Sequence, residues 1–217
     1  MSLISGKRIS IGRAEREFRD DRFFVVAAED TYAPDQYFDG LSIPRVKVLV
    51  IPTPGGSGHS APIHVVERLK EAKRLLKEKG EIQADDEFWV LVDTDHHFED
   101  SHIAGTIRAL KEASHAGFFH AVSNPCFELW LLLHHEELPA GTAFANPQQV
   151  EDRLRQVLGS YNKRSIQSER FTLDGARLAI ARARVLESNP DNPSDDWPAA
   201  NGSRVYRLME RVLGGRS

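Results

Sequence analysis

Two carboxylates follow a short apolar segment near the middle of the chain. Residues 88–92 are all apolar, and Asp93 and Asp95 come directly after them. A run of this length and composition predicts a buried parallel strand. Side chains alternate between the two faces of a strand, so this spacing places both carboxylates on one side. Acids this close repel each other, and a divalent cation with oxygen ligands relieves the repulsion. An isolated pair of acids more often is solvated or caps a helix. Neighbouring residues must therefore decide between that interpretation and a metal site.

A third carboxylate ends an earlier apolar segment. Residues 23–28 predict a first strand, and Glu29 follows it directly. Further strands are expected at 46–51 and 118–122. Pro34 favours the start of a short helix, because its fixed φ suits a first helical position. Apolar residues at helical spacing predict helices in the other segments, near residues 65–79, 103–110, 127–134, 148–158, 173–187 and 203–213.

The alternation of strands and helices predicts an α/β protein with a mostly parallel four-stranded sheet and helices on both faces. Right-handed crossovers give the strand order 2-1-3-4, in which the first and third strands are neighbours. Glu29 and the Asp93/Asp95 pair then meet at the carboxyl ends of adjacent strands. Residues 1–22 are expected to form a polar arm, 23–145 a catalytic domain, and 146–217 a helical extension packed on that domain.

Composition limits the class of protein. The chain has 217 residues, of which 41% are hydrophobic and 28% charged, which suits one globular domain. Its single cysteine, Cys126, excludes an internal disulfide and fits the reducing cytoplasm. No segment resembles a signal peptide or a membrane span, so a cytoplasmic location is expected.

The net charge of −4 is unevenly distributed along the chain. After residue 150 there are twelve basic and nine acidic residues, which leaves sixteen basic and twenty-three acidic residues before it. The acidic first part suits a metal site, and the basic last part suits a polyanion. The same small basic excess also fits ordinary solvated helices.

Several motifs together resemble the RloB-like family (abortive-infection AbiLii type), which has the Toprim fold, a small Rossmann-like domain. The strand that ends in Glu29 is followed by Tyr37 and Phe38, and residues 89–95 have the pattern W-x-x-x-D-x-D. The most specific match is SNPCFELWLLLH at 123–134, and residues 201–206 resemble the family's ending. The resemblance therefore covers most of the chain.

The resemblance implies a Mg²⁺-dependent nuclease of phage defence, often accompanied by a partner ATPase; Mn²⁺ is expected to substitute. It implies that Glu29 is the general acid or base and a metal ligand, and that Asp93 and Asp95 hold metal. The expected substrate is a nucleic acid, either DNA or RNA, with tRNA included, and a homo-oligomer is among the expected states. Ala33 and Pro34 depart from the family pattern, which usually has Thr-Glu there, so one acid is missing.

Other residues have two interpretations each. Glu128, inside an apolar helix, is either a further metal ligand or the structural partner of a buried group, because an unpaired charge there is costly. Ser123 and Asn124 either position a phosphate or cap the following helix, and capping is favoured. His97 and His134 either orient water or phosphate or have structural roles.

Basic residues of the last third are candidate contacts with a nucleic-acid backbone, although most such residues simply solvate helices. The predicted contacts are Arg164, Arg182, Arg184 and Arg204. Two other functions compete with the nuclease. One is a catalytically weak Toprim module that acts through a partner ATPase. The other is a D-x-D metal-dependent transferase, against which the strand-ending Glu29 argues.

Overall fold

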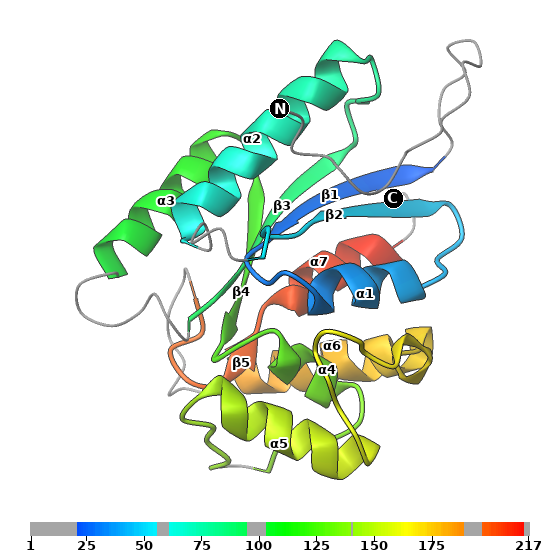
Figure 1. Ribbon diagram of the computed structural model, residues 1–217, viewed down its shortest axis with the longest axis vertical. Helices are drawn as coiled ribbons and strands as arrows, with labels where there is room; N and C mark the ends of the chain where they lie inside the picture. Colours follow the sequence, from blue (N-terminus) through cyan, green and yellow to red (C-terminus); the bar gives the residue numbers. More distant parts are fainter. Residues whose placement is uncertain (1–20, 56–60, 95–102, 140, 189–196, 215–217) are drawn as a thin grey trace.

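The computed structural model describes residues 21–55, 61–94, 103–139, 141–188 and 197–214. At its centre is a five-stranded sheet with the strand order β2-β1-β3-β4-β5 (Figure 1). The strands are β1 (Arg22–Ala28), β2 (Val46–Ile51), β3 (Glu87–Asp93), β4 (Phe119–Asn124) and β5 (Gly202–Ser203). The first four are parallel, and β5 pairs with β4 in the antiparallel sense.

The four predicted strands are present in the predicted order 2-1-3-4. The prediction of a four-stranded sheet was wrong at one edge, where β5 adds a fifth strand. Asn124 pairs with Gly202 and Ser123 with Ser203. A two-residue strand is too short to produce an alternating apolar pattern, so β5 could not be predicted from the sequence. Because of β5, the last helix begins at Val205 and not at residue 203.

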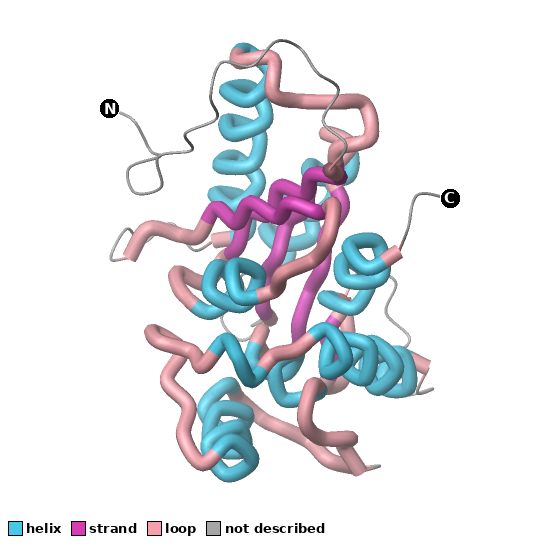
Figure 2. Tube along the Cα trace, turned by 90° about the vertical axis from the view of Figure 1, so that its right-hand side faces the viewer, coloured by secondary structure: helices cyan, strands magenta, loops and turns pink. Residues whose placement is uncertain are grey.

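The helices cover both faces of the sheet, as predicted. They are α1 (Ala33–Gly40), α2 (Pro62–Glu78), α3 (Ile103–His115), α4 (Glu128–Leu133), α5 (Pro147–Leu158), α6 (Leu173–Glu187) and α7 (Val205–Leu213), with a short 3-10 helix, η1 (Ser168–Arg170). Helices α2 and α3 pack on one face, and α1 and α4 to α7 contribute to the core on the other (Figure 1). Figure 2 shows the strands between helices when the molecule is turned by 90°.

Strand periodicity explains this two-sided core. Along β1, Val25 belongs to the apolar cluster under α2 and α3, whereas Phe24 and Val26 belong to the cluster on the other face. On β3, Val90 and Trp89 divide in the same way. Neighbouring side chains of a strand point to opposite faces, so a strand between two helical layers is apolar at every position.

The apolar cluster on the face opposite α2 and α3 joins the strands to the C-terminal helices. All six residues of α4 are buried, and Trp130 is 0% exposed. Trp89 of β3 lies in the same cluster and is 2% exposed. Because α4 contacts α5 and α6, the helices after residue 146 share the core of the sheet. None of the helices described here is long and apolar enough to cross a membrane.

Local signals set the ends of the C-terminal helices. The side chain of Asn146 accepts a hydrogen bond from the Gln149 amide at the start of α5, over 3.1 Å. Gly159 ends α5 with a φ of 76°, a left-handed conformation that glycine adopts without a Cβ clash. The chain then turns into residues 160–167, which lead to η1; η1 contacts α1.

Candidate functional site

Glu29 and Asp93 lie together at the carboxyl ends of β1 and β3. The Asp93 amide donates a hydrogen bond to Oε2 of Glu29 over 3.1 Å. The Glu29 amide in turn donates to the Leu91 carbonyl over 2.9 Å, which extends the pairing of the two strands. The predicted convergence of these two acids is therefore present. Asp95 and His97 lie outside the described residues.

Arg68 of α2 reaches the same end of β1. Its guanidinium donates to the Ala28 carbonyl over 3.2 Å and to the Thr53 hydroxyl. Thr53 also donates to the Ala28 carbonyl, over 3.0 Å. Burial lowers the pKa of Arg68, and the negative charge of Glu29 opposes that shift. These contacts tie the ends of β1 and β2 to α2 and place a positive charge beside Glu29.

Arg68 was not among the predicted site residues, although its position in the sequence carries a signal. The buried stripe of α2 includes Val65, Leu69 and Ala72. Arg68 follows Val65 by three positions and precedes Ala72 by four, which places it beside this stripe. A basic residue next to an apolar stripe is expected to reach across the buried face to a polar group.

Glu128 is the first residue of α4 and is only 3% exposed. The Tyr161 hydroxyl donates a hydrogen bond to its Oε1 over 3.1 Å, and the Cys126 thiol also donates to its carboxylate. Burial and the nearby negative charge of Asp30 raise the pKa of Glu128. The Glu128 carboxylate therefore has structural partners. A structural role was one of the two that the sequence left open.

Cys126 connects Glu128 with the strand-end acids. Its side chain is 2% exposed, and burial, followed by the charges of Glu128 and Asp93, raises its pKa well above the ordinary thiol value. A nucleophilic cysteine needs the opposite shift, because the thiolate is the reactive form. Cys126 is thus a buried hydrogen-bond donor to Glu128 and not a nucleophile.

Lys163 faces the same group of acids from the segment after α5. Its Nζ lies 3.5 Å from Oδ2 of Asp30, the residue that follows Glu29. Oδ1 of Asp30 accepts hydrogen bonds from the amides of Tyr32 (2.6 Å) and Ala33 (3.0 Å), which fixes the start of α1. Burial lowers the pKa of Lys163, but the charges of Glu128 and Asp30 outweigh burial and leave it raised.

Ser123 and Asn124 have a different role from the one favoured by the sequence. The N-cap of α4 is Phe127, without a side-chain hydrogen bond, so the capping prediction was wrong. Both residues belong to β4. The Ser123 hydroxyl is buried against that of Ser203 at 2.8 Å, and the Asn124 amide donates to the Pro198 carbonyl over 2.9 Å. The two side chains fasten β5 and the segment before it to the sheet.

Two of the four arginines predicted to contact nucleic acid bind other groups of the protein instead. Arg204 is 2% exposed and its Nε lies 3.0 Å from the carboxylate of Glu187. A guanidinium this deeply buried does not reach a nucleic-acid backbone. The prediction that Arg204 contacts nucleic acid was therefore wrong, and its role is structural. Arg182 donates to the Leu133 carbonyl over 2.7 Å, which joins α6 to the end of α4.

The other two predicted arginines are exposed. Arg184 pairs with Glu210 of α7 over 2.5 Å. Arg164 lies in the segment after α5, next to Lys163, and its guanidinium is 5.8 Å from the centre of the Tyr32 ring. Of the four arginines, Arg164 is the one that lies next to Lys163 in the chain, and Lys163 faces Asp30.

His134 is structural, which is the interpretation that the sequence favoured. It is 4% exposed, and its Nε2 lies 3.1 Å from the Tyr37 hydroxyl. Burial, with the nearby charges of His135 and Arg182, lowers its pKa to about 3. A neutral ring in an aromatic cluster that includes Trp130 does not orient a phosphate.

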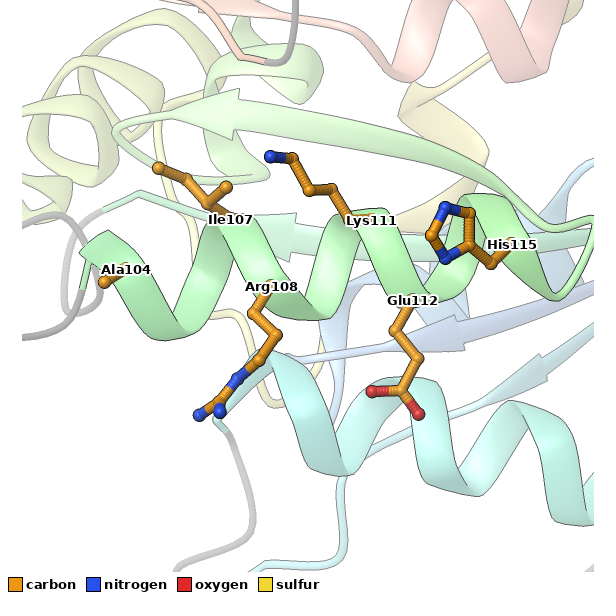
Figure 3. Close-up of a pocket in the computed structure, with 6 residues that line it drawn as sticks. All are labelled: Ala104, Ile107, Arg108, Lys111, Glu112 and His115. Atoms are coloured by element: carbon orange, nitrogen blue, oxygen red, sulfur yellow. The ribbon is translucent and has the colours of Figure 1, made fainter.

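A shallow hollow lies elsewhere, along the exposed side of α3, and Figure 3 shows the side chains that line it. They are Ala104, Ile107, Arg108, Lys111, Glu112 and His115. Glu112 pairs with Lys70, which joins α3 to α2. None of the predicted site residues lines this hollow.

The donor chemistry of the strand ends fits a hard divalent cation. Glu29 and Asp93 offer carboxylate oxygens, which are the ligands that Mg²⁺ prefers. Within residues 21–55, 61–94, 103–139, 141–188 and 197–214, no group of three or more His, Cys, Asp or Glu is arranged to hold a metal. A complete ligand set therefore needs Asp95 or water in addition to these two acids.

Fold and site together define a class of protein. It is an α/β protein with an open, mostly parallel sheet whose acidic residues gather at the carboxyl ends of adjacent strands, where such sheets bind ligands. The family of RloB-like proteins matches residues 24–212, and the chain therefore belongs to the RloB-like family. Comparisons with curated proteins and with solved structures gave no match.

Proposed function

We propose that this RloB-like protein is a metal-dependent endonuclease that cleaves nucleic-acid phosphodiester bonds in the cytoplasm as an effector of phage defence. The observation that carries the proposal is the contact between Glu29 and Asp93 at the ends of neighbouring strands. The resemblance to the Toprim fold supports the same assignment. In this proposal a partner ATPase controls the activity, and the substrate is DNA or RNA, with tRNA included.

Each group at the site has a role in the proposed reaction. Glu29, Asp93 and Asp95 hold the Mg²⁺ ion, for which Mn²⁺ substitutes. The bound ion supplies Lewis-acid stabilisation of the phosphoryl oxygens and lowers the pKa of a bound water. Glu29 is also the proton-transfer group, and Arg68 fixes the end of β1 that carries it. Arg164, beside Lys163 in the chain, contacts the substrate backbone.

The test is direct. Purified protein is incubated with plasmid, single-stranded DNA and total tRNA, in Mg²⁺, Mn²⁺ or EDTA. We expect cleavage of at least one substrate, with loss of activity in EDTA and in the Glu29→Gln and Asp93→Ala variants. Glu87→Gln is the matched control, because Glu87 lies at the opposite end of β3. Cleavage that persists in EDTA or in both site variants would contradict the proposal.

One observation favours a second function, a catalytically weak module that acts through its ATPase partner. Ala33 and Pro34 are buried at the start of α1, and neither supplies the carboxylate that the family usually has at these two positions. In that case the protein binds Mn²⁺ without cleaving any of the three substrates, alone or with the ATPase. Cleavage by the isolated protein would exclude this second function.

A further inference from the structure

The segment between α5 and η1 is held against α1 by one glutamine. The Gln36 amide donates a hydrogen bond to the Lys163 carbonyl over 3.1 Å. The Gln36 carbonyl oxygen accepts from the Ile166 amide over 3.0 Å. Ile166 and Tyr161 are both 8% exposed, so their side chains anchor the segment in the core. The backbone at Lys163 is therefore fixed close to the start of α1, and hence to Asp30.

Electrostatic interactions link the groups around Lys163 to the strand-end acids. Glu29 contacts Asp93 through a hydrogen bond, and the charges of Asp93 and Glu128 both act on Cys126. The charges of Glu128 and of Asp30 act in turn on the Lys163 ammonium, and Asp30 is next to Glu29 in the chain.

Asp30 and Glu128 would be the acids available to a second metal ion, but other groups already bind their oxygens. One oxygen of Asp30 accepts two backbone amides and the other faces Lys163. Glu128 accepts the hydroxyl of Tyr161. Two carboxylates in one poorly solvated region need a compensating cation, and the ammonium of Lys163 is that cation.

We propose that Lys163 takes the place of a second metal ion, so that the active site binds one divalent ion at Glu29 and Asp93 and none at Asp30 and Glu128. This inference rests on the proposed function. In two-metal sites the second ion lies about 3.5–4 Å from the first and neutralises the phosphoryl group. Lysine is a point charge that binds phosphate in the same way. The Lys163 side chain is 46% exposed, so a phosphate can reach this lysine from solvent.

The experiment counts metal ions without measuring cleavage. Mn²⁺ is titrated into the full-length protein without nucleic acid, and free Mn²⁺ is measured by electron paramagnetic resonance. We expect one bound ion per chain in the wild type and in Lys163→Arg, which keeps the charge. Lys163→Met should bind two, and Mn²⁺ should raise its Tm more than that of the wild type. Lys111→Met, which removes an exposed lysine from α3, should bind one.

The outcomes separate this inference from the proposed function. Two ions in the wild type would overturn the inference and leave the metal-dependent nuclease intact. One ion in both the wild type and Lys163→Met would also overturn it, because the lysine would not be what excludes the second ion. No bound Mn²⁺ in the wild type would overturn the proposed metal chemistry and the inference together. If Lys163→Met does not fold, as judged by circular dichroism, Lys163→Gln replaces it, and the wild-type count still applies.

Discussion

Replacing Glu29 by glutamine should separate metal binding from folding. The amide oxygen of glutamine can still accept the hydrogen bond from the Asp93 amide, which measures 3.1 Å to Glu29. The variant also removes one of two neighbouring negative charges, which lowers their repulsion when no metal is bound. We therefore expect Glu29→Gln to lower the free energy of unfolding by about 1 kcal/mol or less, because it keeps the acceptor of the Asp93 amide and loses only the charge that faces Arg68.

Glu29→Ala provides the contrast. It removes the acceptor of the Asp93 amide at a position where Glu29 is 9% exposed. Loss of the acceptor of this part-buried amide should cost about 1–3 kcal/mol. For a chain of this length each kcal/mol lowers the Tm by about 2–4 °C, so the expected loss is roughly 2–12 °C.

Metal affinity should fall in both Glu29 variants. Removing an outer partner of a metal ligand typically weakens binding by about 10–100-fold, and the loss of a ligand itself should be at least as large. We therefore expect the Kd for Mn²⁺ to rise by about 100-fold or more, which the Mn²⁺ titration measures directly. Thermal unfolding followed by circular dichroism gives the Tm of the same samples.

The control removes a negative charge at the other edge of the sheet, where β3 begins. Glu87, at the start of β3, accepts from the Trp89 indole over 3.0 Å and pairs with Arg211 over 3.2 Å. Glu87→Gln should leave the Kd for Mn²⁺ unchanged. Wild-type Mn²⁺ affinity in Glu29→Gln, or equal destabilisation by glutamine and alanine, would refute the assignment of Glu29.

Three further predictions concern pH, stability and salt. Because the pKa of Glu128 is raised in the folded protein, its contribution favours the fold below the ordinary carboxyl pKa and is lost as pH rises through the raised value. The stability of Glu128→Gln relative to the wild type should therefore increase as pH rises above the ordinary carboxyl pKa of about 4.3, measured by urea unfolding; a constant difference would count against this. Glu187→Ala should destabilise the protein by about 1–3 kcal/mol in the same assay, since it removes a carboxylate that faces the buried charge of Arg204, and a loss below about 1 kcal/mol would mean that the pair is unimportant. Arg164→Gln should reduce the slope of log affinity against log salt by about 1 without changing the Tm, and an unchanged slope would return this residue to a solvating role.

The amino-acid sequence determined the layered fold and the meeting point of two acids. Apolar runs defined the four parallel strands, and the rule of right-handed crossovers placed the first strand beside the third. Glu29 and Asp93, 64 positions apart, could be predicted to meet because each ends a strand and adjacent parallel strands end at the same edge. This part of the site follows from backbone geometry alone.

Only the tertiary structure decided which polar side chains surround those acids. Tyr161 and Lys163 come from the segment after α5, and nothing in their local sequence indicates that they face Glu128 and Asp30. Arg204 looked like a surface cation and is 2% exposed. Local periodicity records which side of an element is apolar, and this is enough to build the layers. The partner of a buried polar group depends on how distant helices pack, because the energetic requirement is only that some partner be present.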